Sequence, residues 1–151
     1  MTLAQALLPE FDHEMAGVRK TLERVPEDKF GWRPHPKSGT MGWLASHLAT
    51  LPSLAVRTIE SDAYEIAPDG KPPSGPPKLN TRQEVLETFD KNRDQARTAI
   101  AAASDDHLMK PWTLSYMGKT IFTLPRVQVL RTVFLSHTIH HRAQSLASIC
   151  G

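Results

Sequence analysis

Seven histidines stand out in this chain, and three of them fall within the five residues from His137 to His141. His137 and His141 are four positions apart, and side chains at this spacing are neighbours on the surface of a helix. Two imidazoles placed in this way can chelate one metal ion. The residues between them, Thr138, Ile139 and His140, lack the glutamate that an H-E-x-x-H metalloprotease needs. The pair therefore predicts metal binding without protease chemistry.

A third ligand is predicted at His47, which lies between Leu44 and Leu51 on the apolar stripe of an earlier helical segment. Three histidine ligands would leave coordination positions open for water or substrate, as catalytic zinc sites do. Imidazole nitrogens favour Zn, Ni, Fe or Cu over Mg or Ca, and a bound water or thiol would lose its proton more easily there. The residues alone leave a second interpretation open, in which the inward histidines only hydrogen-bond one another.

The other side chains that could do chemistry fit loops or surfaces better than a reactive site. His140 is off the main line of the last apolar stripe and is expected beside the ligands rather than among them. His35 lies between two prolines, and His13 and His107 fall outside the apolar stripes. Cys150 has no adjacent His or Asp in the sequence and is expected to be an inert thiol. No glycine-rich phosphate loop and no G-x-S-x-G elbow occurs in the sequence.

Four helical segments must position these side chains. Each segment shows apolar residues at steps of three and four, which is the period of an amphipathic helix. Pro9 should kink the first segment or delay its start, and Pro52 should bend the second. Thr81 and Glu84 form a capping-box pattern that marks the start of the third. The predicted helices cover residues 3–25, 41–59, 81–103 and 125–149.

Two connections between these segments do not fit helical structure. Residues 67–78, APDGKPPSGPPK, hold five of the twelve prolines and predict an extended surface loop. Residues 111–123, PWTLSYMGKTIFT, hold two β-favouring runs around Met117 and Gly118. The sequence therefore predicts an all-α four-helix bundle with one long crossover loop and a small irregular or hairpin insertion before the last helix. A single domain over residues 1–151 is expected.

Composition limits the classes of partner. The 18 Lys and Arg residues nearly balance the 16 Asp and Glu residues, for a net charge of +2, whereas nucleic-acid binders usually carry a clustered basic excess. No apolar run approaches the roughly 18 residues of a membrane span, and the first residues lack the basic region of a secretory signal. We therefore expect a soluble cytoplasmic protein with a small-molecule substrate and no nucleic-acid or membrane partner.

Two segments carry a resemblance to a known family. Residues 25–49, VPEDKFGWRPHPKSGTMGWLASHLA, and residues 137–144, HTIHHRAQ, are similar in content, order and separation to segments of the DinB-like superfamily. The resemblance runs over nearly the whole chain. It implies a four-helix bundle with up-down-down-up connections and a divalent metal, often nickel or zinc, with iron as a further candidate. The positions that match the three metal-binding histidines of the family are His47, His137 and His141.

This sequence departs from the family pattern at two places. Ala143 stands where the family has glycine, and this change should leave the helix and its ligands intact. The chain stops at Gly151, where relatives often continue. The substrate-facing wall is therefore expected to be shorter or to be supplied by a partner subunit.

The resemblance also implies a function. Members of the family include transferases and isomerases that use low-molecular-weight thiols, and others that are called metal-dependent hydrolases. We therefore expect a metal-dependent enzyme that adds a small thiol to an electrophile or hydrolyses a small molecule. His140, Arg142 and Gln144 are expected to hold the ligating imidazoles in place or to contact substrate. The alternative is a non-catalytic stress-response or binding protein of the same fold, and a homodimer is expected by analogy.

Overall fold

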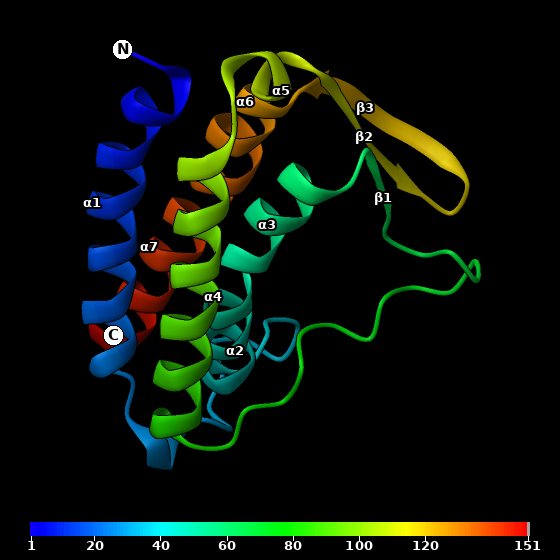
Figure 1. Cartoon of the computed structure of the whole chain (residues 1–151). Helices are drawn as coiled ribbons and strands as arrows, with labels where there is room; N and C mark the ends of the chain where they lie inside the picture. Colours follow the sequence, from blue (N-terminus) through cyan, green and yellow to red (C-terminus); the bar gives the residue numbers. More distant parts are fainter. Residues whose placement is uncertain (151) are drawn as a thin grey trace.

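The computed structural model describes residues 1–150, which are mostly helical and carry one small sheet. The long helices are α1 (Leu3–Glu23), α4 (Arg82–Ala102) and α7 (Ser136–Cys150), and shorter ones are α2 (Met41–Thr50), α3 (Pro52–Glu60), α5 (Asp105–Met109) and α6 (Arg126–Gln128). A 3₁₀ turn, η1 (Glu27–Lys29), and a π-helical segment, η2 (Val129–Leu135), complete the helical part. The strands are β1 (Ala63–Glu65), β2 (Pro111–Tyr116) and β3 (Lys119–Pro125). Figure 1 shows the long helices side by side, with the sheet at one end of them.

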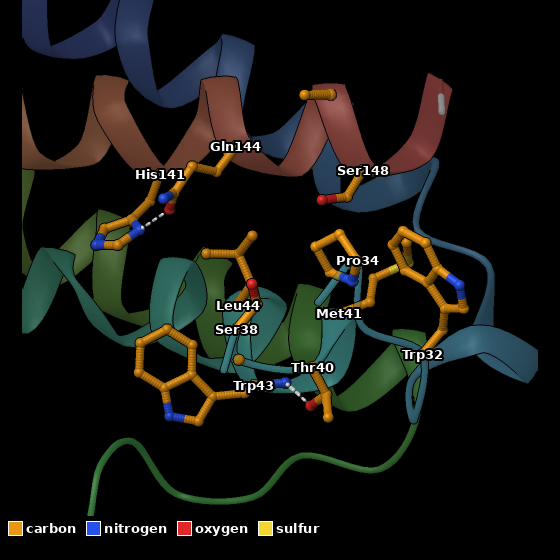
Figure 2. Close-up of a pocket in the computed structure, with 12 residues that line it drawn as sticks. Trp32, Pro34, Ser38, Thr40, Met41, Trp43, Leu44, His141, Gln144 and Ser148 are labelled. Carbon is orange, nitrogen blue, oxygen red and sulfur yellow. Dashed lines mark hydrogen bonds between the residues drawn. The ribbon is translucent and has the colours of Figure 1, made fainter. Parts of the chain in front are cut away.

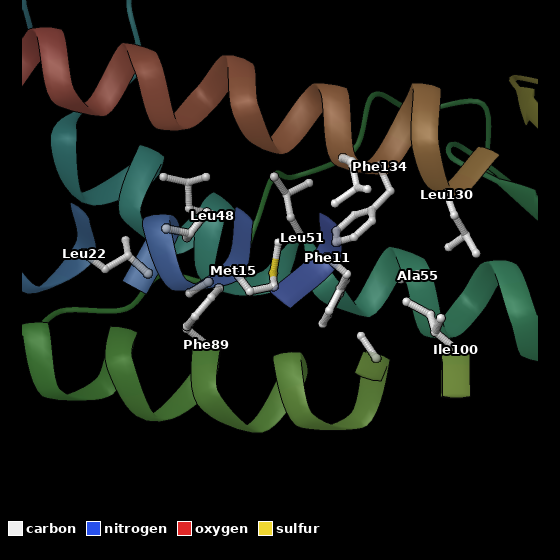
Figure 3. Close-up of a cluster of buried hydrophobic side chains, with 14 of the residues drawn as sticks. Phe11, Met15, Leu22, Leu48, Leu51, Ala55, Phe89, Ile100, Leu130 and Phe134 are labelled. Atoms are coloured by element: carbon white, nitrogen blue, oxygen red, sulfur yellow. The ribbon is translucent and has the colours of Figure 1, made fainter. Parts of the chain in front are cut away.

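The core lies between α1, α2, α3, α4 and the last helix, where the predicted apolar stripes meet (Figure 3). Phe11 of α1 packs against Phe134 of η2 with the ring centroids 6.1 Å apart. Burying a side chain of this kind contributes about 1.5–3 kcal/mol to the free energy of unfolding. The fully buried apolar side chains of the core include Phe11, Met15, Val18, Leu22, Leu48, Phe89, Ile100, Leu130 and Phe134.

The two prolines that interrupt the stripes act differently. Pro52 divides the second predicted helix into α2 and α3, because it has no N–H to continue the hydrogen-bond ladder and instead occupies the first turn of α3. Pro9 lies inside α1, which begins at Leu3, so the start of this helix is not delayed. A capping box supports that early start: the Thr2 hydroxyl accepts from the Gln5 N–H, and the Gln5 side chain accepts from the Thr2 N–H.

The sheet corrects the all-α prediction. Strands β2 and β3 pair antiparallel around Met117 and Gly118, whose φ values of 50° and 76° suit a two-residue hairpin turn. Strand β1 pairs parallel with β2, with Ala63 opposite Thr113, so the long connection between α3 and α4 is partly ordered. Residues 66–80 of that connection form no helix or strand, as the prolines predict.

Arg126 joins the sheet to the last helix. Its side chain is only 1% exposed, and its guanidinium donates to the backbone oxygens of Ser61 and Pro111 at 2.8 and 3.0 Å. It also pairs with the Asp62 carboxylate at 2.6 Å. Because these partners lie where β1 and β2 begin, one buried cation fixes the sheet against the start of α6.

No helix in the described part of the chain is both long and apolar enough to cross a membrane.

Candidate metal centre

Helices α2 and α7 pack against each other and bring three histidines together. The Nε2 atom of His137 lies 3.1 Å from Nε2 of His47 and 3.0 Å from Nε2 of His141. The three rings meet nearly edge to face, with interplanar angles of 78° to 89°. Three side chains from two helices therefore aim the same ring nitrogen at a single point.

The π-helical segment η2 decides which residues of α7 face the core. The Ser136 N–H donates to the Arg131 oxygen, five residues back, so one extra residue enters the turn and the side chains that follow are rotated. Thr138 and Ser145, only 1% and 3% exposed, take the inward positions. The prediction that His137 and His141 lie on the inward stripe is therefore wrong by one residue.

The histidine pair instead lies at the rim of the core, facing α2. His137 is exposed, whereas His47 and His141 are partly buried. A site at the rim can be reached from solvent, which a site at the centre of the bundle could not.

The spacing of the nitrogens fits a single metal ion. Two imidazole nitrogens that each lie about 2.05 Å from zinc are about 2.9 Å apart at a right angle and about 3.3 Å apart at the tetrahedral angle. The separations of 3.0 and 3.1 Å fall between these values. Hydrogen bonds alone satisfy the arrangement less well, because each neutral ring nitrogen offers only one proton or one lone pair.

The environment keeps the three rings neutral. Burial, followed by the charges of His141 and His137, lowers the pKa of His47 to about 4. Burial, followed by the charges of His141 and His140, also lowers the pKa of His137. Burial lowers the pKa of His141 as well, opposed by its hydrogen bond to Gln144 and assisted by the charge of His140. Neutral imidazoles have the free lone pair that a metal requires. Within residues 1–150, no carboxylate belongs to the cluster.

Gln144 holds the ring of His141. Its Oε1 atom accepts a hydrogen bond from His141 Nδ1 at 2.7 Å. An amide oxygen can only accept, so the proton of the neutral ring is on Nδ1 and the lone pair of Nε2 points at the cluster. Gln144, one turn further along α7, thus makes the kind of contact predicted for it, a hydrogen bond that orients a candidate ligand.

Trp43 is a residue of the site to which the sequence assigns no definite role. Its ring stacks on His47 with centroids 5.0 Å apart and an interplanar angle of 20°, and it meets His141 edge-on. The spacing of four residues between Trp43 and His47 on α2 is the signal that could have identified it.

The other candidate residues are placed elsewhere. Arg142 faces α1, where its guanidinium pairs with Glu14 at 2.9 Å and occupies the space left free by Gly17. His140 is exposed, and its ring lies 5.2 Å from that of His141. His107 contacts the last turn of α3 through the Ile59 oxygen at 2.7 Å. His13, His35 and Cys150 are exposed and lie outside the cluster.

A cavity of about 500 Å³ opens beside the cluster and is lined by His141, Gln144 and Trp43, among others (Figure 2). Residues of α7 form one wall, and the start of α2 with the loop before it forms the other. A metal ion at the cluster would therefore be next to a space that can hold a small molecule.

Comparison with known proteins agrees with this architecture. The sequence profile of the DinB superfamily matches residues 10–145. The chain belongs to the DinB superfamily. The resemblance expected from residues 25–49 and 137–144 is thereby confirmed.

A solved structure shows the same fold. The crystal structure of a DinB-like protein from Bacillus cereus ATCC 10987 superposes with a TM-score of 0.66, covering 95% of this chain and 88% of that one at 17% sequence identity. At this identity the likeness concerns the fold alone. No curated protein matches the chain.

Proposed function

We propose that this DinB-superfamily protein is a four-helix bundle, a single domain over residues 1–151, that binds a divalent metal ion through His47, His137 and His141 and acts on a small molecule. The observation that carries the proposal is the convergence of three neutral Nε2 atoms next to an open cavity. Zinc or nickel suits this set of ligands best, with iron as a further candidate.

A divalent metal bound there would lower the pKa of a coordinated thiol or water and so supply a nucleophile near neutral pH. The chain contributes neutral ligands, which leave the positive charge of the ion undiminished. Gln144 orients the ring of His141, and Trp43 covers one face of the ring of His47. These contacts hold the rings of His141 and His47 in place before any metal binds. Metal binding therefore costs less side-chain conformational entropy.

Of the two reaction classes that we consider, addition of a small thiol to an electrophile fits better than hydrolysis. A free thiol has a pKa of about 8.5 and loses its proton far more easily than water does. The cluster in the described part of the chain includes no carboxylate that could serve as a general base for water. Hydrolysis remains the second candidate because the open coordination positions would admit water as readily as a thiol.

A homodimer is part of the proposal. Ile139 and Leu146 are 39% and 36% exposed and lie two turns apart on one face of α7. A second copy of the chain could cover these side chains without closing the cavity, because neither lines it.

Cobalt substitution tests the reaction class. Cobalt(II) in a three-histidine site gives visible absorption, and a coordinated thiolate adds a sulfur-to-metal charge-transfer band. We expect 2-mercaptoethanol to produce this band in the cobalt-loaded protein and not in the His141→Ala variant. A spectrum that no small thiol changes, in a protein that does bind cobalt, would contradict thiol activation and leave hydrolysis or simple binding.

A further inference from the structure

The cavity beside the three histidines contains almost no charge. Among residues 1–150, no lining side chain is Lys, Arg, Asp or Glu, and His141 is the one titratable side chain in the lining. Its walls are mainly aromatic and aliphatic, with Trp32, Pro34, Met41 and Trp43 on the side opposite α7 (Figure 2). Lys29 and Lys78 line adjoining cavities, the first together with Trp32 and Met41 and the second together with Trp43.

Two of the three tryptophans line this cavity and are unusually open to solvent. Trp32 and Trp43 are each 41% exposed, whereas Trp112 is completely buried in the core. Large aromatic side chains left open around a concave surface are typical of sites that take up a flat apolar group. Gly75 approaches one edge of the Trp43 indole, since a Cβ atom there would lie 3.1 Å from Nε1.

The few polar groups are placed along one wall. Gln144 lines the cavity and uses its oxygen on His141, so its amide N–H groups are the part that can donate to a ligand. Ser148 lies one turn further along α7, and within residues 1–150 its hydroxyl makes no hydrogen bond. These groups can orient a ligand through one or two hydrogen bonds, but they cannot balance a full charge.

We propose that this cavity binds an uncharged ligand with a planar aromatic body, held between Trp32, Trp43 and α7, whose reactive end reaches the three-histidine cluster at His141. The inference rests on the proposed function and specifies its substrate class. A charged body would lose its hydration without gaining a counter-ion, which costs several kcal/mol of binding free energy. The volume of about 500 Å³ corresponds to roughly 17 water molecules, which is room for a ring system with short substituents.

A matched pair of thiols tests the inference on the zinc-loaded protein. Benzyl mercaptan has an uncharged body, and 4-(mercaptomethyl)benzoate carries the same reactive end with a carboxylate on the ring. Nitrogen-15 NMR of the indole N–H groups reports binding, with Trp32 and Trp43 as cavity signals and Trp112 as the internal control. We expect benzyl mercaptan to shift the two cavity signals and to bind at least about tenfold more tightly than the carboxylate. Equal affinities, or shifts confined to Trp112, would overturn the inference.

Two alanines of α7 provide matched variants. Ala147 lines the cavity and Ala143 does not, although both are exposed on the same helix. Ala147→Phe should fill the space and weaken benzyl mercaptan binding by at least about tenfold, whereas Ala143→Phe should leave it unchanged. An unchanged affinity in Ala147→Phe would place the ligand elsewhere.

A second pair of probes separates this inference from the metal proposal. Benzyl alcohol and 4-(hydroxymethyl)benzoate are titrated into metal-free protein, where only the cavity can discriminate between them. If the chain binds no zinc but still prefers benzyl alcohol, the proposed metal-dependent function fails, and the inference that the cavity binds an uncharged aromatic ligand stands. If it binds zinc but shows no preference in either pair of probes, the inference about the ligand of the cavity fails, and the proposed metal site stands.

Discussion

Replacing Gln144 should change the metal affinity of the cluster in a direction that depends on the substitution. The wild-type side chain contributes one hydrogen bond of 2.7 Å from His141 Nδ1 to its Oε1 atom. A single neutral hydrogen bond is worth about 0.5–1.5 kcal/mol net. Gln144→Leu removes it and frees His141 to place its proton on Nε2, so we expect zinc to bind about 2- to 13-fold more weakly. The upper end of this range reaches the roughly 10- to 100-fold loss that is usual when a hydrogen-bond partner of a metal ligand is removed.

Gln144→Glu should have the opposite effect. A carboxylate accepts the same hydrogen bond with about twice the strength and makes the imidazole a better donor to the metal. We expect zinc affinity equal to or greater than that of the wild-type protein. The assay is competition with a chromophoric chelator at fixed pH, and Gln128→Leu, an exposed residue of α6, is the control. Equal affinities for the wild type and Gln144→Leu, or a weaker Gln144→Glu, would refute this account of His141.

Three further changes test the fold and its assembly. Arg126→Met removes the two hydrogen bonds that the buried guanidinium donates to the Ser61 and Pro111 oxygens, so Tm should fall by about 6–12 °C for a loss of about 3 kcal/mol. The exposed Arg131→Met is the control, and a similar fall there would contradict the proposed role of Arg126. The Arg19 guanidinium, through its hydrogen bond, holds the pKa of the Asp90 carboxyl below its usual value. Because that pKa is lowered by folding, the pair stabilises the protein above about pH 3.9 and stops doing so as the pH falls through the folded-state pKa. Asp90→Asn should therefore lower Tm by about 1–4 °C at pH 7 and by less in acid, and a pH-independent difference would count against the pair. Analytical ultracentrifugation should find a species heavier than the 16.8 kDa chain that Ile139→Asp converts to monomer, and a wild-type monomer would exclude the dimer.

Helical periodicity predicts most of the helical residues and singles out the three histidines that meet at the site. Phe11, Met15 and Phe89 lie in the core where their stripes place them, because burying apolar area dominates the folding free energy. His47 and the H-x-x-x-H pair come together because α2 packs against α7, although the pair lies one residue off the inward stripe. The hairpin around Gly118 is also visible in the sequence, since its turn needs residues that tolerate positive φ.

The features that the sequence does not reveal depend on contacts between distant segments. Strand β1 has only three residues and exists because it pairs with β2, some fifty positions away. The π-helical turn before His137 has no local sequence signal, yet it moves the inward stripe of α7 by one residue. Pro9 and Pro52 show that proline can lie inside one helix and divide another, a difference that the local sequence does not reveal.

The central claim is that His47, His137 and His141 hold one metal ion. The most direct measurement is the metal content, by mass spectrometry, of protein purified without a histidine tag or nickel resin and then incubated with zinc or nickel and dialysed. We predict about one ion per chain in the wild type and in the control variant His13→Ala, and none in His141→Ala. A wild-type content below about one-tenth of an ion per chain with both metals would contradict the claim.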